Sequence, residues 1–160
     1  MQTVNQIRIH GDPDRIFALA ANIQDWPRIL PHYRYVIVEE QSELYKTARM
    51  GASRDGLPVK WRARQELLPD ERRIRFQHVG GITRGMDVEW RIDPERDSVL
   101  VTIHHELRYP IPLLGPLFAE YVVGRLFVHN IAGKTLQCIK QIAESEARAA
   151  AESSSPASAR

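Results

Sequence analysis

The spacing of the hydrophobic residues changes along the chain and predicts which segments are strands and which are helices. Apolar and polar side chains alternate over residues 3–10, which predicts a first strand. Two short helices are predicted over residues 15–21 and 24–29, and Asp12-Pro13 before them is typical of a helix N-terminus. The period then returns to two, which predicts six more strands, over residues 33–40, 43–53, 58–68, 73–78, 85–93 and 99–107.

The last predicted element is one long helix over residues 113–148. Its core-facing stripe comprises Leu114, Leu117, Tyr121, Val128, Ile131, Ala132, Thr135, Ile139 and Ile142. Gly124 lies on the same stripe. Because glycine costs a helix about 0.5–1 kcal/mol relative to alanine, it indicates a need for space or for a close approach of another element there. The first half of the helix is also apolar on its other side, at Val122, Val123, Leu126 and Phe127. This second apolar side predicts a contact with a second copy of the chain, a membrane surface or another partner.

This order of elements predicts an α+β fold. Six consecutive strands with short connections favour an antiparallel sheet, and a sheet with one apolar face needs a cover. The final helix is the only predicted element long enough to provide that cover. We therefore expect a single domain over residues 1–150, with two short helices after the first strand, and a Ser/Ala-rich disordered tail over residues 151–160. A helix that is thinned where it faces a curved sheet leaves room for a ligand.

Composition and charge narrow the kind of partner. The chain has 22 basic and 20 acidic residues, and the net charge of +2 is too balanced to predict nucleic-acid binding. The basic outward positions of the strands leave an RNA-binding role open. That role is disfavoured, because acidic residues share the same face and can pair with the basic ones across strands.

Several other kinds of protein are disfavoured by what the sequence contains. The single cysteine, Cys138, excludes an internal disulfide, and no apolar run is long enough to span a bilayer, so we expect a cytoplasmic protein. His104 and His105 are adjacent and face opposite sides of a strand, so they cannot chelate one metal together. There is no glycine-rich phosphate loop and no serine in a nucleophile elbow. We expect neither a metal site nor a cofactor.

Four segments carry a resemblance to a known family: Ala21-Asn22-Ile23-Gln24-Asp25-Trp26-Pro27, Val59-Lys60-Trp61, Gly85-Met86-Asp87-Val88-Glu89-Trp90 and Thr135-Leu136-Gln137-Cys138-Ile139-Lys140. With the order of elements, they resemble the START-like (SRPBCC) superfamily, and within it the polyketide cyclase/dehydrase group, which includes aromatase/cyclases and coenzyme-Q-binding proteins. The resemblance covers nearly the whole chain. It implies the helix-grip fold, a curved antiparallel sheet of about seven strands around a long C-terminal helix, with a cavity between them. Superfamily members bind lipids, sterols, quinones, hormones or polyketides, so the fold alone does not select the ligand.

The inward positions of the predicted strands and helix supply the candidate ligand-binding residues. They are Trp61, Gln65, Phe76, Met86, Trp90, Tyr121 and Gly124. Arg49 joins them if the strand over residues 43–53 buries the phase of Tyr45 and Thr47, a register that the sequence leaves open. The apolar candidates fit a small-molecule site or an ordinary core. A buried polar group without a partner costs about 1–3 kcal/mol, so the inward polar residues indicate either a ligand-filled interior or hydrogen bonds to backbone.

Tyr33, His78 and His105 are the candidate catalytic residues, as groups that could move protons. In the aromatase/cyclases that the chain resembles, a tyrosine at the place of Tyr33 lines the pocket. Those enzymes also carry an interior arginine on the strand with the first tryptophan, where the matching position here is Gln65. A neutral amide polarises a carbonyl less strongly than an arginine, so this departure weakens the interpretation as a cyclase.

Three hypotheses about function follow. The first is binding of a hydrophobic small molecule, such as a polyketide, a quinone or a lipid-like compound, in the cavity. The second is a polyketide aromatase/cyclase or dehydratase, in which Gln65 or Arg49 would orient carbonyls. The third is a partner-docking module that uses the apolar start of the long helix. A cationic side chain inside the cavity would favour the enzyme, whereas a wholly neutral lining would favour binding or carriage.

Overall fold

The computed structural model describes residues 2–81, 83–108 and 129–155. The strands of this part of the chain are β1 (Gln2–Ile9), β2 (Tyr33–Gln41), β3 (Tyr45–Arg54), β4 (Leu57–Leu68), β5 (Arg73–Gly81), β6 (Met86–Pro94) and β7 (Val99–Leu107). Its helices are α1 (Pro13–Ala21), α2 (Trp26–Ile29) and α4 (His129–Ser153), with single 3-10 turns at η1 (Ile23–Asp25) and η2 (Pro69–Glu71). This order confirms the predicted α+β fold.

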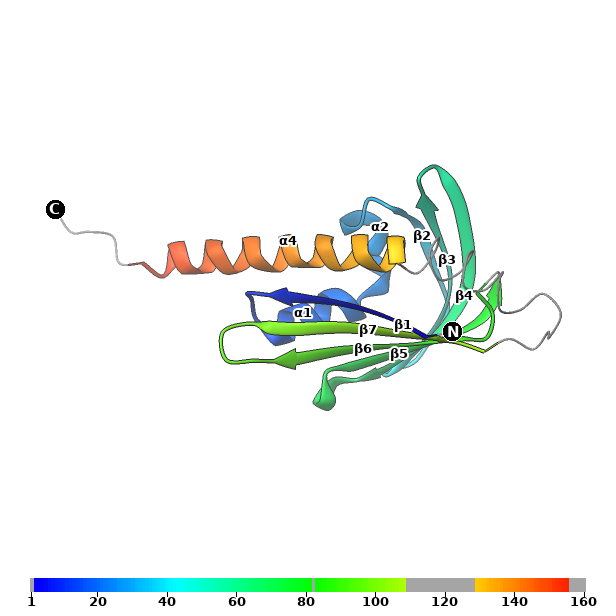
Figure 1. Cartoon of the computed structure of the whole chain (residues 1–160), viewed down its shortest axis with the longest axis horizontal. Helices are drawn as coiled ribbons and strands as arrows, with labels where there is room; N and C mark the ends of the chain where they lie inside the picture. The colour runs from blue at the N-terminus through cyan, green and yellow to red at the C-terminus, as the bar shows by residue number, and fades with distance from the viewer. Residues whose placement is uncertain (1, 82, 109–128, 156–160) are drawn as a thin grey trace.

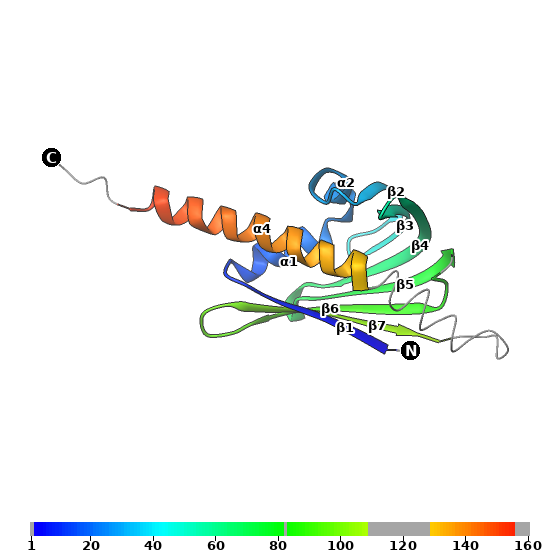
Figure 2. The ribbon, with the colours of Figure 1, turned by 45° about the horizontal axis from the view of Figure 1, so that its top comes forward.

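The seven described strands form one antiparallel sheet in the order β1-β7-β6-β5-β4-β3-β2. The first strand pairs with the last, β1 with β7, and the other neighbours are consecutive in the chain. The sheet curves, and α4 lies across its concave side with its last turns extending beyond the strands (Figure 1; Figure 2). The arrangement is the helix grip that the sequence predicted.

Alternation along the strands places one face of the sheet in the core. On β6, Met86, Val88 and Trp90 are buried, whereas Asp87 and Arg91 between and beyond them are exposed. The helix closes this core through Ile131, Ala132, Thr135, Leu136, Ile139 and Ala143. Burying a large apolar side chain contributes about 1.5–3 kcal/mol, so the contact between sheet and helix supplies a large part of the stability.

The short helices place Trp26 in the core. Asp12 caps α1, since its Oδ1 accepts a hydrogen bond from the backbone N–H of Asp14 at 3.1 Å, and Pro13 opens the helix as predicted. The indole Nε1 of Trp26 donates to the carbonyl oxygen of Leu19 at 3.1 Å, which ties α2 to α1. The Trp26 side chain is therefore held in one orientation against the sheet.

The outer face of the sheet carries paired charges. Arg62 donates to Glu39 at 2.6 Å, and Arg75 donates to Glu89 at 3.3 Å. Exposed pairs of this kind contribute about 0–1 kcal/mol each. Their main effect here is that carboxylates neutralise part of the positive charge of the basic residues on this face.

The first half of the predicted long helix, residues 113–128, lies outside the described residues. So do the candidate ligand-binding residues Tyr121 and Gly124 and the second apolar side at Val122, Val123, Leu126 and Phe127. At its other end α4 continues to Ser153 instead of ending at Arg148, because the alanines over residues 149–151 favour helix. No helix within the described ranges is long and apolar enough to cross a membrane.

Candidate functional site

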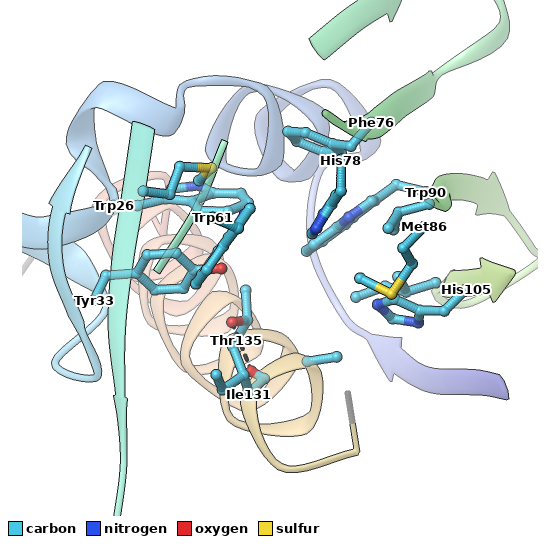
Figure 3. Close-up of a pocket in the computed structure, with 14 residues that line it drawn as sticks. Trp26, Tyr33, Trp61, Phe76, His78, Met86, Trp90, His105, Ile131 and Thr135 are labelled. Carbon is cyan, nitrogen blue, oxygen red and sulfur yellow. Dashed lines mark hydrogen bonds between the residues drawn. The ribbon is translucent and has the colours of Figure 1, made fainter. Parts of the chain in front are cut away.

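A cavity lies between the inner face of the sheet and α4 (Figure 3). About 60 Å³ of it is open to the centres of water molecules. That space is large enough for a few waters. The described residues that line it are Trp26, Tyr33, Met50, Trp61, Phe76, His78, Met86, Val88, Trp90, Ile103, His105, Ile131, Ala132 and Thr135. Seven of the predicted ligand-binding and catalytic residues thus meet at one space: Tyr33 from β2, Trp61 from β4, Phe76 and His78 from β5, Met86 and Trp90 from β6, and His105 from β7.

All three tryptophans of the chain line the cavity, and their rings form a continuous wall. The ring centroids of Trp26 lie 5.0 Å from those of Tyr33 and 6.0 Å from those of Trp90. Tyr33 in turn lies 5.9 Å from Trp61. Each such pair contributes about 0.5–1.5 kcal/mol beyond its buried area, so the wall is held in shape before any ligand arrives.

His78 extends this wall with a polar ring. Its imidazole is parallel to the Trp61 indole, with 6.0 Å between centroids and 3° between planes. Its Nδ1 lies 2.6 Å from the hydroxyl oxygen of Thr83, which is fully buried. Burial lowers the pKa of His78 from 6.5 to about 3, with a smaller contribution from His105. The side chain is therefore neutral at pH 7.

His105 is the second neutral imidazole of the cavity. The side chain is buried, and its Nδ1 makes no hydrogen bond to any described residue. Burial again lowers the pKa to about 3, with a smaller contribution from the neighbouring His104. An unpartnered buried nitrogen costs about 1–3 kcal/mol, which suits a site that a ligand or water completes.

Tyr33, His32 and Thr135 form the polar junction between β2 and α4. The Thr135 hydroxyl donates to the carbonyl oxygen of Ile131 at 2.8 Å, so it accepts from His32 Nε2, which lies 2.8 Å away. Burial lowers the pKa of His32 to about 4 and raises the pKa of the Tyr33 hydroxyl, which an interaction with Thr135 partly opposes. Tyr33 is thus protonated and His32 neutral at pH 7.

Two sequence-predicted site residues lie elsewhere. Arg49 is on the outer face, where its Nε forms an ion pair with Glu39 Oε1 at 2.8 Å and its side chain is 58% exposed. The reason is register: Ala48, Met50 and Ala52 take the inward phase of β3. Gln65 is buried but does not line the cavity.

The amide nitrogen of Gln65 is used inside the fold, whereas its Oε1 is buried with no hydrogen-bond partner among the described residues. Its Nε2 donates to the carbonyl oxygen of Ala21 at 2.9 Å, so the side chain ties β4 to the end of α1. Arg49 and Gln65 were the two residues that the sequence offered for orienting a carbonyl, and neither lines the cavity. No described residue that lines the cavity carries a charge at pH 7, and no group of three metal-ligating side chains occurs among the described residues.

Several lining residues were not among the sequence-predicted candidates. Trp26 appeared only as part of a segment that marks the family. The direction of the Met50 side chain depended on the register of β3, which the sequence left open. Ile131, Ala132 and Thr135 stood on the predicted apolar stripe, but the sequence did not distinguish cavity-facing positions from packed ones. A tryptophan followed by proline in a short helix was the one available signal for Trp26.

Comparison with known proteins identifies the family. Residues 9–130 match the family described as polyketide cyclase/dehydrase and lipid transport. The chain belongs to this family. No curated protein sequence is significantly similar to it.

Several solved structures of other proteins have the same fold as this chain. The Zhui aromatase/cyclase from Streptomyces sp. R1128 superimposes with a TM-score of 0.77 at 20% identity, covering 94% of this chain and 97% of that one. The di-domain ARO/CYC StfQ from the steffimycin biosynthetic pathway has a TM-score of 0.77 at 21% identity, covering 92% of this chain and 51% of that one. A START superfamily protein from Mycobacterium smegmatis has a TM-score of 0.63 at 17% identity, covering 92% and 97%. At these identities the likeness establishes the START-like helix-grip fold.

Proposed function

We propose that the protein binds a neutral, flat, hydrophobic molecule in the cavity between sheet and α4 and carries it without chemical change. The observation that carries the proposal is the lining: an aromatic wall with neutral polar groups and no charged side chain among the described residues. Ligand sites usually combine an apolar surface with a few fixed polar groups. A polyketide, a quinone or a lipid-like compound meets this description.

The size of the cavity indicates that side chains must move when a ligand binds. Small-molecule sites commonly occupy about 300–1,000 Å³, well above the open space found here. Met50 and Met86 line the cavity, and unbranched methionine side chains change shape at low cost. A ligand of that size therefore displaces these two side chains, while the aromatic wall keeps its place.

A polyketide aromatase/cyclase or dehydratase is the second candidate. The family and the fold shared with aromatase/cyclases favour it, and Tyr33, His78 and His105 face one space. The pKa values of these residues argue against it, because acid–base catalysis is most efficient when the pKa of the catalytic group lies near the working pH. Both histidines have a pKa of about 3, and the pKa of Tyr33 is raised. The described lining also offers no cation for a developing enolate.

A partner contact through the apolar start of the long helix remains a separate proposal. It rests on the sequence at Val122, Val123, Leu126 and Phe127. Changing Val123 and Phe127 together to aspartate should alter the oligomeric state, the membrane association or the partner binding of the protein. If size-exclusion chromatography, vesicle sedimentation and affinity capture all match the unmodified protein, the apolar start of the helix has no such role.

The ligand itself can be identified by native mass spectrometry of protein purified from its own host. The expected result is a bound, neutral, aromatic or prenylated molecule that is released unchanged by organic extraction. Recovery of a cyclised product after adding a linear poly-keto substrate would instead support the enzyme. Protein that carries no molecule and binds none in the titration below would contradict both.

A titration with 2-acetylnaphthalene, a neutral flat ketone, tests the cavity directly. The three indole N–H resonances report on it, because every tryptophan lines the space. Ala132→Leu adds three carbon atoms to the wall and should weaken binding at least about tenfold, since the space would be filled. Gly133→Ala is the matched control: its added methyl group meets nothing within 4 Å. Equal affinities for the two variants would place the ligand elsewhere.

A further inference from the structure

Thr83 is buried beside the cavity but belongs to no segment that the sequence marked as functional. It lies between β5 and β6 and has an exposed fraction of 0%. Its hydroxyl oxygen lies 2.6 Å from Nδ1 of His78, and this is the only side-chain hydrogen bond that either residue makes with the described residues. Thr83 is therefore placed to influence the orientation of a cavity-lining histidine and which of its ring nitrogens carries the proton.

The direction of this bond follows from the donors and acceptors that surround Thr83. A hydroxyl has one proton to donate, and a buried donor needs an acceptor. Within the described residues, His78 Nδ1 is the acceptor within reach of the Thr83 hydroxyl. If Nδ1 carried the proton instead, the hydroxyl proton of Thr83 would be buried with no acceptor. The hydroxyl therefore donates to Nδ1, and a neutral imidazole with an unprotonated Nδ1 carries its proton on Nε2.

The other ring nitrogen faces the cavity. His78 lines the open space, and its side chain points into the space that the labelled residues enclose (Figure 3). Since Nδ1 is bound to Thr83, Nε2 is the nitrogen left for a ligand, and it makes no hydrogen bond to a described residue. Parallel stacking on Trp61 holds the plane of the ring.

We propose that Thr83 is a positioning residue that holds His78 as a hydrogen-bond donor through Nε2–H, so that the cavity selects ligands whose oxygen or nitrogen accepts a hydrogen bond. This inference deepens the proposed function and rests on it for its ligand. It also gives the bound ligand a defined orientation. The flat body of the ligand lies against the tryptophans, and its acceptor atom contacts His78. An isosteric hydrocarbon fills the same space and leaves the buried N–H without a partner, which is why the site discriminates against it.

The protonated nitrogen of His78 can be observed in the ligand-free protein. In ¹⁵N-labelled protein at pH 7, two-bond correlations from the ring-carbon protons distinguish protonated from unprotonated nitrogen. We expect the proton on Nε2 in the unmodified protein and in Thr83→Ser, and a mixture of both tautomers in Thr83→Val, which keeps the shape but lacks the hydroxyl. A proton on Nδ1 in the unmodified protein would overturn the inference, whether or not any variant folds.

A matched pair of ligands tests the selectivity. 2-Acetylnaphthalene and 2-isopropenylnaphthalene have the same shape, but the carbonyl oxygen of the first is a CH₂ group in the second. We expect the unmodified protein and Thr83→Ser to bind the ketone about three- to tenfold more tightly than the alkene. The ratio should approach one in His78→Phe, which has no donor, and should fall by about twofold in Thr83→Val, in which only part of the molecules offer the Nε2–H tautomer.

The outcomes separate the inference from the proposed function. If both ligands bind the unmodified protein equally well, the cavity binds hydrophobic molecules and the donor role of His78 is refuted. If neither ligand binds and the protein from its own host carries no molecule, the proposed function is refuted, and the tautomer measurement alone decides whether Thr83 positions the ring.

Discussion

Lowering the pH from 7.5 to 5.5 should destabilise this protein strongly, because three histidines are buried in their neutral form. The pKa is about 4 for His32 and about 3 for His78 and His105, each lowered from 6.5 chiefly by burial. The unfolded chain, with pKa values near 6.5, binds protons before the folded one does. Their contribution to stability is therefore complete above pH 6.5 and is lost as the pH falls below that value.

The size of the effect follows from the shifts. At pH 5.5 the folded imidazoles remain neutral, and each unfolded one favours unfolding by about 1 kcal/mol or a little more, so the three together cost about 3–4 kcal/mol, with the smallest share from His32, which is less deeply buried than the other two. At pH 4.5 the sum reaches about 8 kcal/mol, which is comparable to the whole stability of a typical domain. Carboxylates with a lowered pKa, such as Glu39 and Glu146, add their loss only below about pH 4.5, outside this window.

Urea unfolding followed by tryptophan fluorescence at pH 7.5, 6.5 and 5.5 measures the effect. The free energy of unfolding should fall by about 3–4 kcal/mol over the window, and by about 1 kcal/mol less in His78→Phe or His105→Phe, which each remove one buried imidazole. A free energy that stays constant between pH 7.5 and 5.5 would show that these histidines are accessible to protons in the folded protein. The neutral lining on which the proposed function depends would then be lost.

Three further substitutions test particular contacts. Gly51→Ala should lower the free energy of unfolding by about 1–3 kcal/mol, because the added carbon would overlap the Tyr35 ring on the outer face; an unchanged urea midpoint would mean that the ring moves aside freely. Gly133→Ala should raise it by about 0.5–1 kcal/mol, since the position on α4 is open and alanine favours helix; a lower midpoint would contradict the packing of α4. Arg49→Gln should leave the dissociation constant for 2-acetylnaphthalene within about twofold of the unmodified value, because the Arg49 side chain pairs with Glu39 on the outer face. A much weaker complex would mean that Arg49 contacts the ligand in the cavity.

The fold was predictable because the strands that carry it alternate without ambiguity. On β4, Trp61, Ala63 and Gln65 are inward and the charged residues between them are outward, so one register satisfies the hydrophobic effect. On β3 both phases contain small or polar side chains, with Thr47 on one and Ala48 on the other. Either register would bury a similar surface there, so the direction of Arg49 needed the pairing with β2 and β4.

The site was less predictable because its decisive contacts join segments that are distant in sequence. Gln65 had the expected inward phase, but its partner is the carbonyl of Ala21, at the end of a helix whose position on the sheet no local pattern specifies. Thr83 lies in a connection between strands, where no periodicity distinguishes a buried hydroxyl from an exposed one. Periodicity selects a face of the sheet, whereas hydrogen-bond partners depend on how elements meet across the core.

The neutral lining also limits the chemistry that membership in a cyclase family allows. A histidine with a pKa of about 3 is protonated in on the order of one molecule in 10,000 at pH 7, so neither His78 nor His105 can supply a proton as a ready general acid. Stabilisation of an enolate would fall to neutral donors, the Tyr33 hydroxyl and the Nε2–H inferred for His78. Single donors of this kind contribute about 10²–10³ to a rate when they are aimed at a developing charge. The same donors are sufficient to orient a bound carbonyl, which is all that a carrier requires, and this is why binding accounts for the cavity with fewer assumptions than turnover.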